Sequence, residues 1–222
     1  KPDDWHLHLR DGDMLNAVLP FTARCFARAI VMPNLTPPVR TAAQAEAYRE
    51  RIIAALPEGV NFTPLMTCYL TDDADAGDIV QGHQDGIFSA AKLYPAGVTT
   101  NSAEAVTNIV HVEGVLGRME EAGMPLLVHG ETTDPGIDVF DREKVFIERT
   151  LAPLVERFPG LKVVFEHVTT ADAINFVTAQ GSNLAATITV HHLIINRGAM
   201  FEGGIRPHMY CLPVAKRETH RL

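Results

Sequence analysis

The sequence predicts an α/β protein of the (β/α)8 barrel class, with the C-terminal strand and helices of the barrel absent from this chain. Seven short apolar runs alternate with helical segments, and several runs lack the polar alternation of a half-exposed strand. Such runs are typical of strands buried on both faces of a parallel sheet. A doubly wound sheet is the alternative, but no Gly-x-Gly-x-x-Gly motif follows the first run, which argues against its dinucleotide-binding form. We expect one incomplete barrel domain over residues 1–222.

The predicted strands cover residues 5–10, 29–33, 62–70, 86–94, 126–129, 162–167 and 184–190. Helices are predicted between them, over residues 41–56, 101–122, 141–158 and 170–181. Asn101 is expected to cap the second of these helices, with Glu104 as its reciprocal partner three residues on. The acidic run at residues 72–75 is interpreted as the solvated start of a further helix.

The composition is that of an ordinary globular protein, with 46% hydrophobic and 21% charged residues. Its 19 basic and 27 acidic side chains give a net charge of 19 − 27 = −8, which argues against nucleic-acid and anionic-membrane partners. Three cysteines without a Cys-x-x-Cys pair argue against a disulfide framework. No run is long enough to span a bilayer and no signal peptide opens the chain, so we expect a cytoplasmic location.

The first predicted strand carries a pair of candidate metal ligands. Alternate side chains of a strand share a face, so His6, His8 and Arg10 are expected to point the same way. Two imidazoles at this spacing can chelate one metal ion. The alternative is a pair of ordinary histidines on a half-exposed strand.

Three more polar side chains close apolar strands directly before loops. They are Lys92, His129 and His167. In a (β/α) barrel the active site is built at the carboxyl ends of the strands. Four histidines and a lysine that converge on this rim are hard to explain as core filling, so the sequence predicts a metal site there.

Lys92 is unusual in such a site, because an ammonium group is repelled by metal cations. Reaction of its amine with CO2 would give a carbamate, an anion whose two oxygens can bridge two metal ions. Two adjacent metals can lower the pKa of a bridging water and polarise a carbonyl. The alternative for Lys92 is a salt-bridged lysine at a strand end.

These motifs together resemble the amidohydrolase superfamily and, within it, dihydroorotases of the shorter, free-standing bacterial type. The opening motif is Asp-Trp-His-Leu-His-Leu-Arg-Asp-Gly at residues 4–12. The His-x-His pair alone marks only the superfamily, whereas the combined set of motifs is highly specific and runs the whole length of the chain. The other matching segments are residues 32–38, 91–95, 99–102, 125–131, 165–170, 203–208 and 210–213.

The resemblance implies a binuclear zinc site with two Zn²⁺ per chain. His6 and His8 would hold one zinc ion, His129 and His167 the other, and Lys92, carrying a CO2-derived carbamate, would bridge the two. The substrate-binding residues that it implies are Arg10 and Asn34 for the substrate carboxylate, Thr99 and Thr100 on a mobile loop, His129, and the backbone of Leu212.

The activity implied is the interconversion of N-carbamoyl-L-aspartate and L-dihydroorotate in pyrimidine synthesis, by a homodimer that acts on this small-molecule substrate. The alternatives are another binuclear amidohydrolase, such as a hydantoinase or allantoinase, and a non-catalytic dihydroorotase-like subunit. The family also places a zinc-binding, proton-shuttling aspartate at the end of the eighth strand, beyond Leu222. We therefore expect a polypeptide that ends at Leu222 to be poorly soluble and inactive. His191 and His192 follow the seventh strand, but the resemblance gives neither a role.

Overall fold

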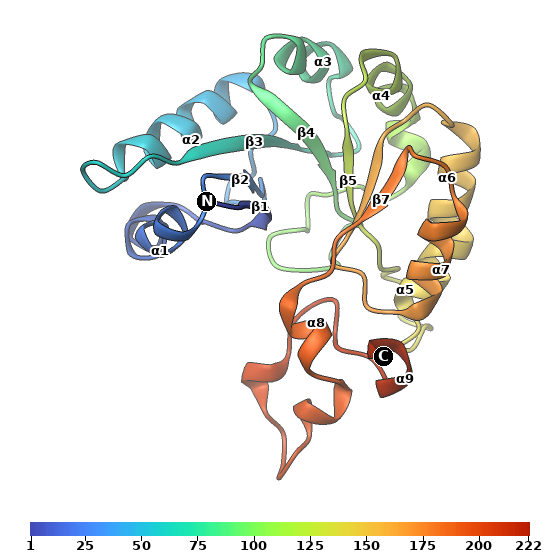
Figure 1. Cartoon of the computed structure of the whole chain (residues 1–222). Coiled ribbons are helices and arrows are strands. Elements are labelled where there is room, and N and C mark those ends of the chain that lie inside the picture. The colour runs from blue at the N-terminus through green and yellow to red at the C-terminus, as the bar shows by residue number, and fades with distance from the viewer.

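Seven parallel strands form a single sheet that curls into an open barrel wall (Figure 1). The structure is a computed structural model and describes residues 1–222. The strands lie in the sheet in the order in which they occur along the chain, without the reversal of a doubly wound sheet. The predicted barrel class is thereby confirmed. The strands are β1 (Asp3–Leu7), β2 (Arg28–Val31), β3 (Thr63–Tyr69), β4 (Phe88–Leu93), β5 (Leu126–His129), β6 (Val163–Glu166) and β7 (Leu184–Ala186).

The longer helices cover the outer, convex face of the sheet (Figure 1). They are α1 (Gly12–Cys25), α2 (Ala42–Ala54), α3 (Ala76–Gln84), α4 (Ile109–Ala122), α6 (Ala152–Arg157) and α7 (Ala171–Ala179), with α5 (Arg142–Phe146) joined to α6 by the π-helical turn η1 (Ile147–Leu151). None of the helices is long and apolar enough to cross a membrane. After β7 the chain forms only short elements, which are α8 (Val190–Ile194), η2 (Arg197–Met200), η3 (Pro207–Met209) and α9 (Glu218–Arg221).

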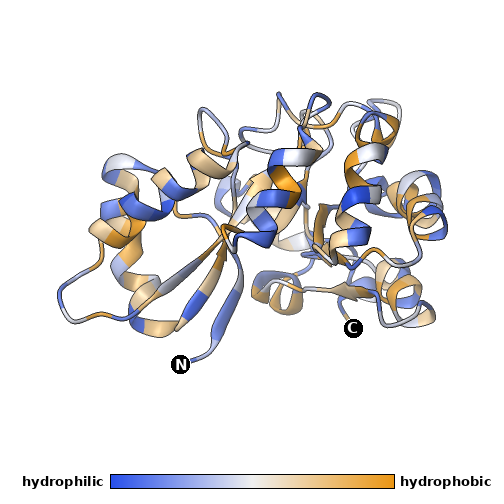
Figure 2. Ribbon diagram, turned by 90° about the horizontal axis from the view of Figure 1, so that it is seen from above, coloured by the Kyte–Doolittle hydropathy of each residue, from blue (hydrophilic) through white to orange (hydrophobic).

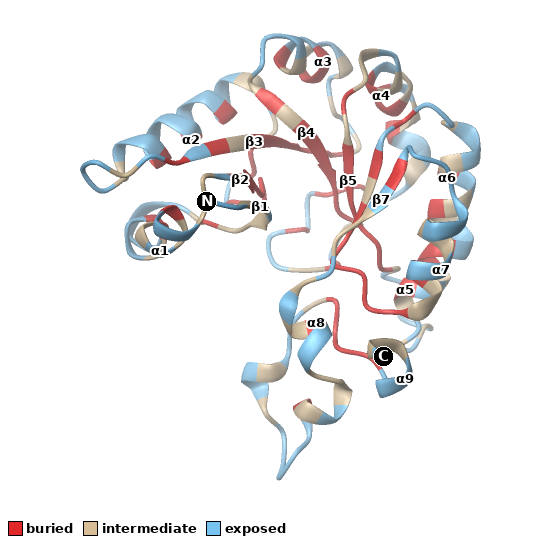
Figure 3. Ribbon diagram, viewed as in Figure 1, coloured by how far each residue is buried: buried red, intermediate tan, exposed pale blue.

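Both faces of the sheet are buried. Between the sheet and the helices lies the main apolar core, to which strand residues such as Val31, Leu93 and Phe165 contribute. A smaller cluster on the opposite face contains Ile30 and Leu127, which alternate with core residues along their strands. Strands of this kind need apolar residues at consecutive positions, as the sequence has. Figure 2 shows helices that carry both hydrophobic and hydrophilic residues, and Figure 3 shows burial concentrated on the strands.

The end of β1 differs from the prediction. The strand ends at Leu7, so His8 and Arg10 do not belong to it, and the expectation that both share a strand face with His6 is wrong in this respect. Arg10 has a left-handed backbone, with φ at +59°, because the chain turns there towards α1, whose N-cap is Asp11. The hydroxyl of Tyr48 donates to the carbonyl of Arg10 at 2.6 Å and holds this turn in place.

The helix expected at residues 101–122 is shorter than predicted. α4 begins at Ile109 and is capped by Asn108, so the expectation of a cap at Asn101 is wrong. Asn101 instead has a left-handed backbone, and its side-chain amide donates to the carbonyl of Asn34 at 3.0 Å. Asparagine is common both at helix N-caps and in the left-handed backbone conformation, so the residue type alone did not distinguish a cap from a turn. The acidic run was interpreted correctly, since Asp75 caps α3.

Two further boundaries differ. The predicted helix at residues 141–158 is interrupted by the π turn η1. The seventh strand ends at Ala186 rather than at residue 190, and Val190 already belongs to α8. The apolar run there continues past the strand because its last residues turn into a helix.

The close contact between Gly130 and Phe165 predicts a large effect of a single methyl group. A Cβ at Gly130 would lie 1.9 Å from a ring carbon of the fully buried Phe165. We expect Gly130→Ala to lower the free energy of unfolding by about 1–3 kcal/mol through overpacking. Gly114→Ala is the control, because a Cβ at this exposed position in α4 meets no atom within 4 Å. It should raise stability by up to about 1 kcal/mol. Urea unfolding measures the free energy of unfolding of both variants. Equal changes in the two variants would contradict the close contact between Gly130 and Phe165.

Candidate metal centre

The four predicted histidines and Lys92 come together at the carboxyl ends of β1, β4, β5 and β6. The Nε2 atoms of His6 and His8 lie 3.1 Å apart. The ring centroid of His167 lies 5.0 Å from that of His6 and 4.7 Å from that of His129. Lys92 is fully buried beside them. The curl of the sheet thus gathers side chains that are up to 161 residues apart in the sequence, the separation of His6 and His167 (167 − 6).

Glu166 is a central residue of this cluster that the sequence analysis did not single out. Its carboxylate is buried and pairs with the ammonium group of Lys92, while its Oε1 lies 3.0 Å from Nδ1 of His6. The register pairs Glu166 with His129, which keeps the ends of β5 and β6 level. The Lys92–Glu166 pair is the salt bridge that was the alternative interpretation of Lys92. An acidic residue directly before His167 was the available sequence signal.

A second buried glutamate, Glu131, was also missed. Its Oε2 lies 2.8 Å from Nε2 of His129, and both residues are almost completely buried. The spacing His-x-Glu was visible in the sequence. This spacing alone did not predict the contact. Side chains two residues apart meet in this way only where the backbone after β5 bends suitably.

The environment favours the neutral form of His8, His129 and His167. Burial and the neighbouring charges of His6, Arg10 and Lys92 together lower the pKa of His8 to about 3. Burial also lowers the pKa values of His129 and His167. Only neutral imidazole can bind a metal ion, so these shifts favour metal binding. Burial likewise lowers the pKa of Lys92, and the charge of Glu166 opposes this shift.

The residues present fit a divalent metal ion. Nδ1 of His6, Nδ1 of His8, Nδ1 of His167 and Oε1 of Glu166 are buried and have no hydrogen-bond partner within the protein. One nitrogen or oxygen atom from each of His6, Glu166 and His167 lies within 4.8 Å of the others. Buried polar atoms without partners are unfavourable, and a cation coordinated by such lone pairs would remove much of that cost.

The predicted carboxylate-binding residues lie together beside the cluster. Nη1 of Arg10 donates to the carbonyl of Asn34 at 3.3 Å, and Arg10 forms no ion pair with an acidic side chain. Nδ2 of Asn34 donates to the carbonyl of Thr100 at 2.9 Å. Asn34 therefore joins the loop of residues 95–101 to the loop that follows β2. The hydroxyls of Thr99 and Thr100 have no hydrogen-bond partner in the protein.

Leu212 lies on a segment that is held in place by a hydrogen bond from the side chain of His192. Nε2 of His192 lies 2.9 Å from the carbonyl of Pro213, which can only accept, so this nitrogen carries the proton and donates. Nδ1 then accepts from the hydroxyl of Thr189 at 2.6 Å. The residues after Leu212 are buried as far as Lys216. His192 thus has a structural contact next to a predicted substrate-binding position.

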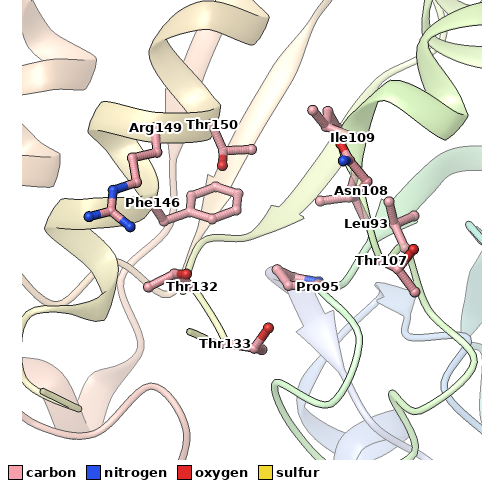
Figure 4. A pocket seen from close by; sticks show the side chains of 11 residues that line it. Leu93, Pro95, Thr107, Asn108, Ile109, Thr132, Thr133, Phe146, Arg149 and Thr150 are labelled. Carbon is pink, nitrogen blue, oxygen red and sulfur yellow. The ribbon is translucent and has the colours of Figure 1, made fainter. Parts of the chain in front are cut away.

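A pocket of about 240 Å³ lies between the start of α4 and the α5–η1 segment (Figure 4). It is lined by threonines and by Arg149, but by none of the four histidines. Arg149 is exposed and pairs with Asp134 at 3.4 Å. The pocket is therefore separate from the candidate metal centre.

Comparison with known proteins agrees with the fold and the motifs. A model of the amidohydrolase family matches residues 4–220. The chain therefore belongs to the amidohydrolase family, as the resemblance in its motifs indicated.

Within that family the similar proteins are dihydroorotases. The dihydroorotase of Sphingopyxis alaskensis is 64% identical over 222 residues, which are 100% of this chain and 65% of that protein. The crystal structure of dihydroorotase from Campylobacter jejuni matches with a TM-score of 0.90 at 41% identity, covering 98% of this chain and 62% of that chain. A dihydroorotase from Saccharomyces cerevisiae in complex with 5-fluoroorotic acid matches with a TM-score of 0.88 at 31% identity, covering 99% and 63%. The chain thus spans slightly less than two thirds of these relatives.

The buried His192 predicts a pH dependence of stability. Burial lowers its pKa to about 4, whereas histidine in the unfolded chain has the ordinary value of 6.5. As the pH falls below 6.5 the unfolded state takes up the proton first, so the free energy of unfolding decreases until the pH reaches about 4. We expect this decrease to be smaller in metal-free His192→Gln than in the unchanged metal-free protein. Urea unfolding at a series of pH values measures it, and identical pH dependence would contradict the burial of a neutral His192.

Proposed function

We propose that the protein containing this chain is a dihydroorotase, which interconverts N-carbamoyl-L-aspartate and L-dihydroorotate. The observation that carries the proposal is the 64% identity to a dihydroorotase along the entire chain. No feature of the structure favours a hydantoinase or a non-catalytic subunit. In particular, all five metal-binding side chains expected within these residues are present.

The division of the metal ligands rests on the family resemblance. His6 and His8 would hold one zinc ion, and His129 and His167 the other, and the ring centroids within each pair lie 5.0 Å and 4.7 Å apart. When bound, zinc ions lower the pKa of water and polarise a substrate carbonyl. The protein's own contribution is a set of imidazoles, two of them buried, that are already gathered at one end of the sheet.

Carboxylation of Lys92 and metal binding should depend on each other. Burial lowers the pKa of Lys92 and so raises the fraction of neutral amine, the form that reacts with CO2. A carbamate on Lys92 would be an anion beside the carboxylate of Glu166, and two buried anions repel each other. Metal cations next to the carbamate would offset this repulsion. When Lys92 carries no carbamate, its ammonium group pairs with the carboxylate of Glu166.

The substrate would bind through groups that the fold leaves free. Arg10 offers a planar guanidinium for a carboxylate, and Asn34 lies beside it. Thr99 and Thr100 would hydrogen-bond the substrate from the loop of residues 95–101. The backbone of Leu212 would read the ring amide, and His129 would contact the substrate from the metal side.

A homodimer in the cytoplasm completes the proposal, on the basis of the family resemblance. Sedimentation equilibrium of the purified protein decides its oligomeric state, and cell fractionation decides its location. A monomer at micromolar concentration would contradict the first part.

The activity is tested with metal-loaded protein. We expect turnover of dihydroorotate and none of hydantoin, loss of turnover on treatment with a chelator, and recovery on addition of Zn²⁺.

Lys92→Ala should abolish turnover and lose at least one metal ion, because it removes the bridging group. A ¹³C NMR signal of a carbamate after incubation with ¹³C-labelled bicarbonate should appear in the unchanged protein and be missing in Lys92→Ala. A fully metallated, active protein with an unmodified Lys92 would contradict the bridging role.

The loop of residues 95–101 is expected to act as a lid over the substrate. Gly97 has φ at +77° and gives the loop a turn that other residues rarely adopt. Replacing both Thr99 and Thr100 by Ala should lower kcat/KM for dihydroorotate by about 10–100-fold, the size expected for one or two lost hydrogen bonds to a charged ligand. Metal content and Tm should remain nearly unchanged, since neither hydroxyl has a partner in the protein. Normal turnover by this variant would make the loop a simple connection.

A further inference from the structure

A buried glutamate, Glu131, hydrogen-bonds one of the candidate ligand histidines. Oε2 of Glu131 lies 2.8 Å from Nε2 of His129. Glu131 is 0% exposed, so no solvent competes for this contact. Glu166 also lies near a histidine, with its Oε1 3.0 Å from Nδ1 of His6, but these two atoms form no hydrogen bond.

A carboxylate can only accept a hydrogen bond, so the ring nitrogen facing it carries the proton. A neutral imidazole has one N–H, and its other nitrogen then presents a lone pair. For His129 the lone pair is therefore on Nδ1.

We infer that Glu131 is a positioning residue that sets the tautomer of His129, so that a metal ion meets Nδ1 of this ring. Metal-binding histidines generally donate their other N–H to a carboxylate or carbonyl, which fixes the ring and raises its basicity. The inference rests on the proposed function only in taking His129 as a metal ligand.

Glu131 can be replaced without disturbing the candidate bridging group. Glu166, in contrast, pairs with Lys92. Oε2 of Glu131 hydrogen-bonds only His129, and Oε1 has no hydrogen-bond partner. Its contact with the cluster is therefore a single hydrogen bond.

Glu143 provides a matched control, because it is a buried glutamate of purely structural character. It is 1% exposed and accepts hydrogen bonds from the backbone and hydroxyl of Thr169 and from the hydroxyl of Thr170. It contacts no histidine. Its replacement measures what the loss of any buried, hydrogen-bonded carboxylate does to the protein.

The experiment compares Glu131→Met, Glu131→Gln and Glu143→Met in the protein as it occurs, with Zn²⁺ as the probe. Metal content is measured by atomic spectroscopy and affinity by competition with a chelator. Met offers Nε2 of His129 only a weak thioether acceptor, so we expect Glu131→Met to weaken the binding of one of the two zinc ions by about 10–100-fold. Gln can still accept from Nε2 of His129 through its amide oxygen, so it should retain most of the affinity. Glu143→Met should lower Tm but leave zinc affinity close to that of the unchanged protein.

Selective ¹⁵N-histidine NMR of the metal-free, unchanged protein reports the tautomers without any variant. The inference expects the proton on Nε2 of His129. A proton on Nδ1 of His129, undiminished zinc affinity in Glu131→Met, or an equal loss in Glu143→Met would each overturn it. Zinc binding with no turnover of dihydroorotate would instead defeat the proposed function and leave this inference standing. If the unchanged protein bound no zinc, the inferred metal role would fail.

Discussion

The buried pair of Lys92 and Glu166 is the interaction around which the centre is organised. Neither side chain is exposed to solvent, and moving two charges out of water costs several kcal/mol each before their attraction offsets part of it. Such a pair persists only inside a rigid, well-packed surround. The curled sheet supplies that surround, because β4 and β6 bring these two side chains together with apolar layers on both faces.

This constraint explains why the rest of the centre is so polar yet so enclosed. His6, His8 and His167 lie in the same cluster, and Nδ1 of each lacks a hydrogen-bond partner within the protein. Buried polar atoms without hydrogen-bond partners destabilise a protein core, but their lone pairs are available to coordinate cations. The same enclosure lowers the pKa values of His8, His129 and His167, so the site offers neutral ligands at ordinary pH.

The loops around the centre are coupled to it through a few specific hydrogen bonds. Asn34 joins the turn at Arg10 to the loop that carries Thr100. His192 joins α8 to the segment after Leu212. Groups expected to bind substrate are thus connected to the strands by contacts that single substitutions can break, which is why their roles can be tested one at a time.

Much of this protein was determined by local sequence alone. Consecutive apolar residues indicate strands buried on both faces, and polar residues at their ends, such as Lys92 and His129, mark the rim, because strand order and side-chain alternation follow from simple periodicity. Only the tertiary structure decided that β1 ends at Leu7 and that Asn101 fastens a loop instead of capping a helix. It alone also revealed Glu131 and Glu166 as partners of the histidines. Their contacts depend on the curvature of the sheet and on backbone bends after the strands, which arise from packing between segments distant in the sequence and leave no periodic signal.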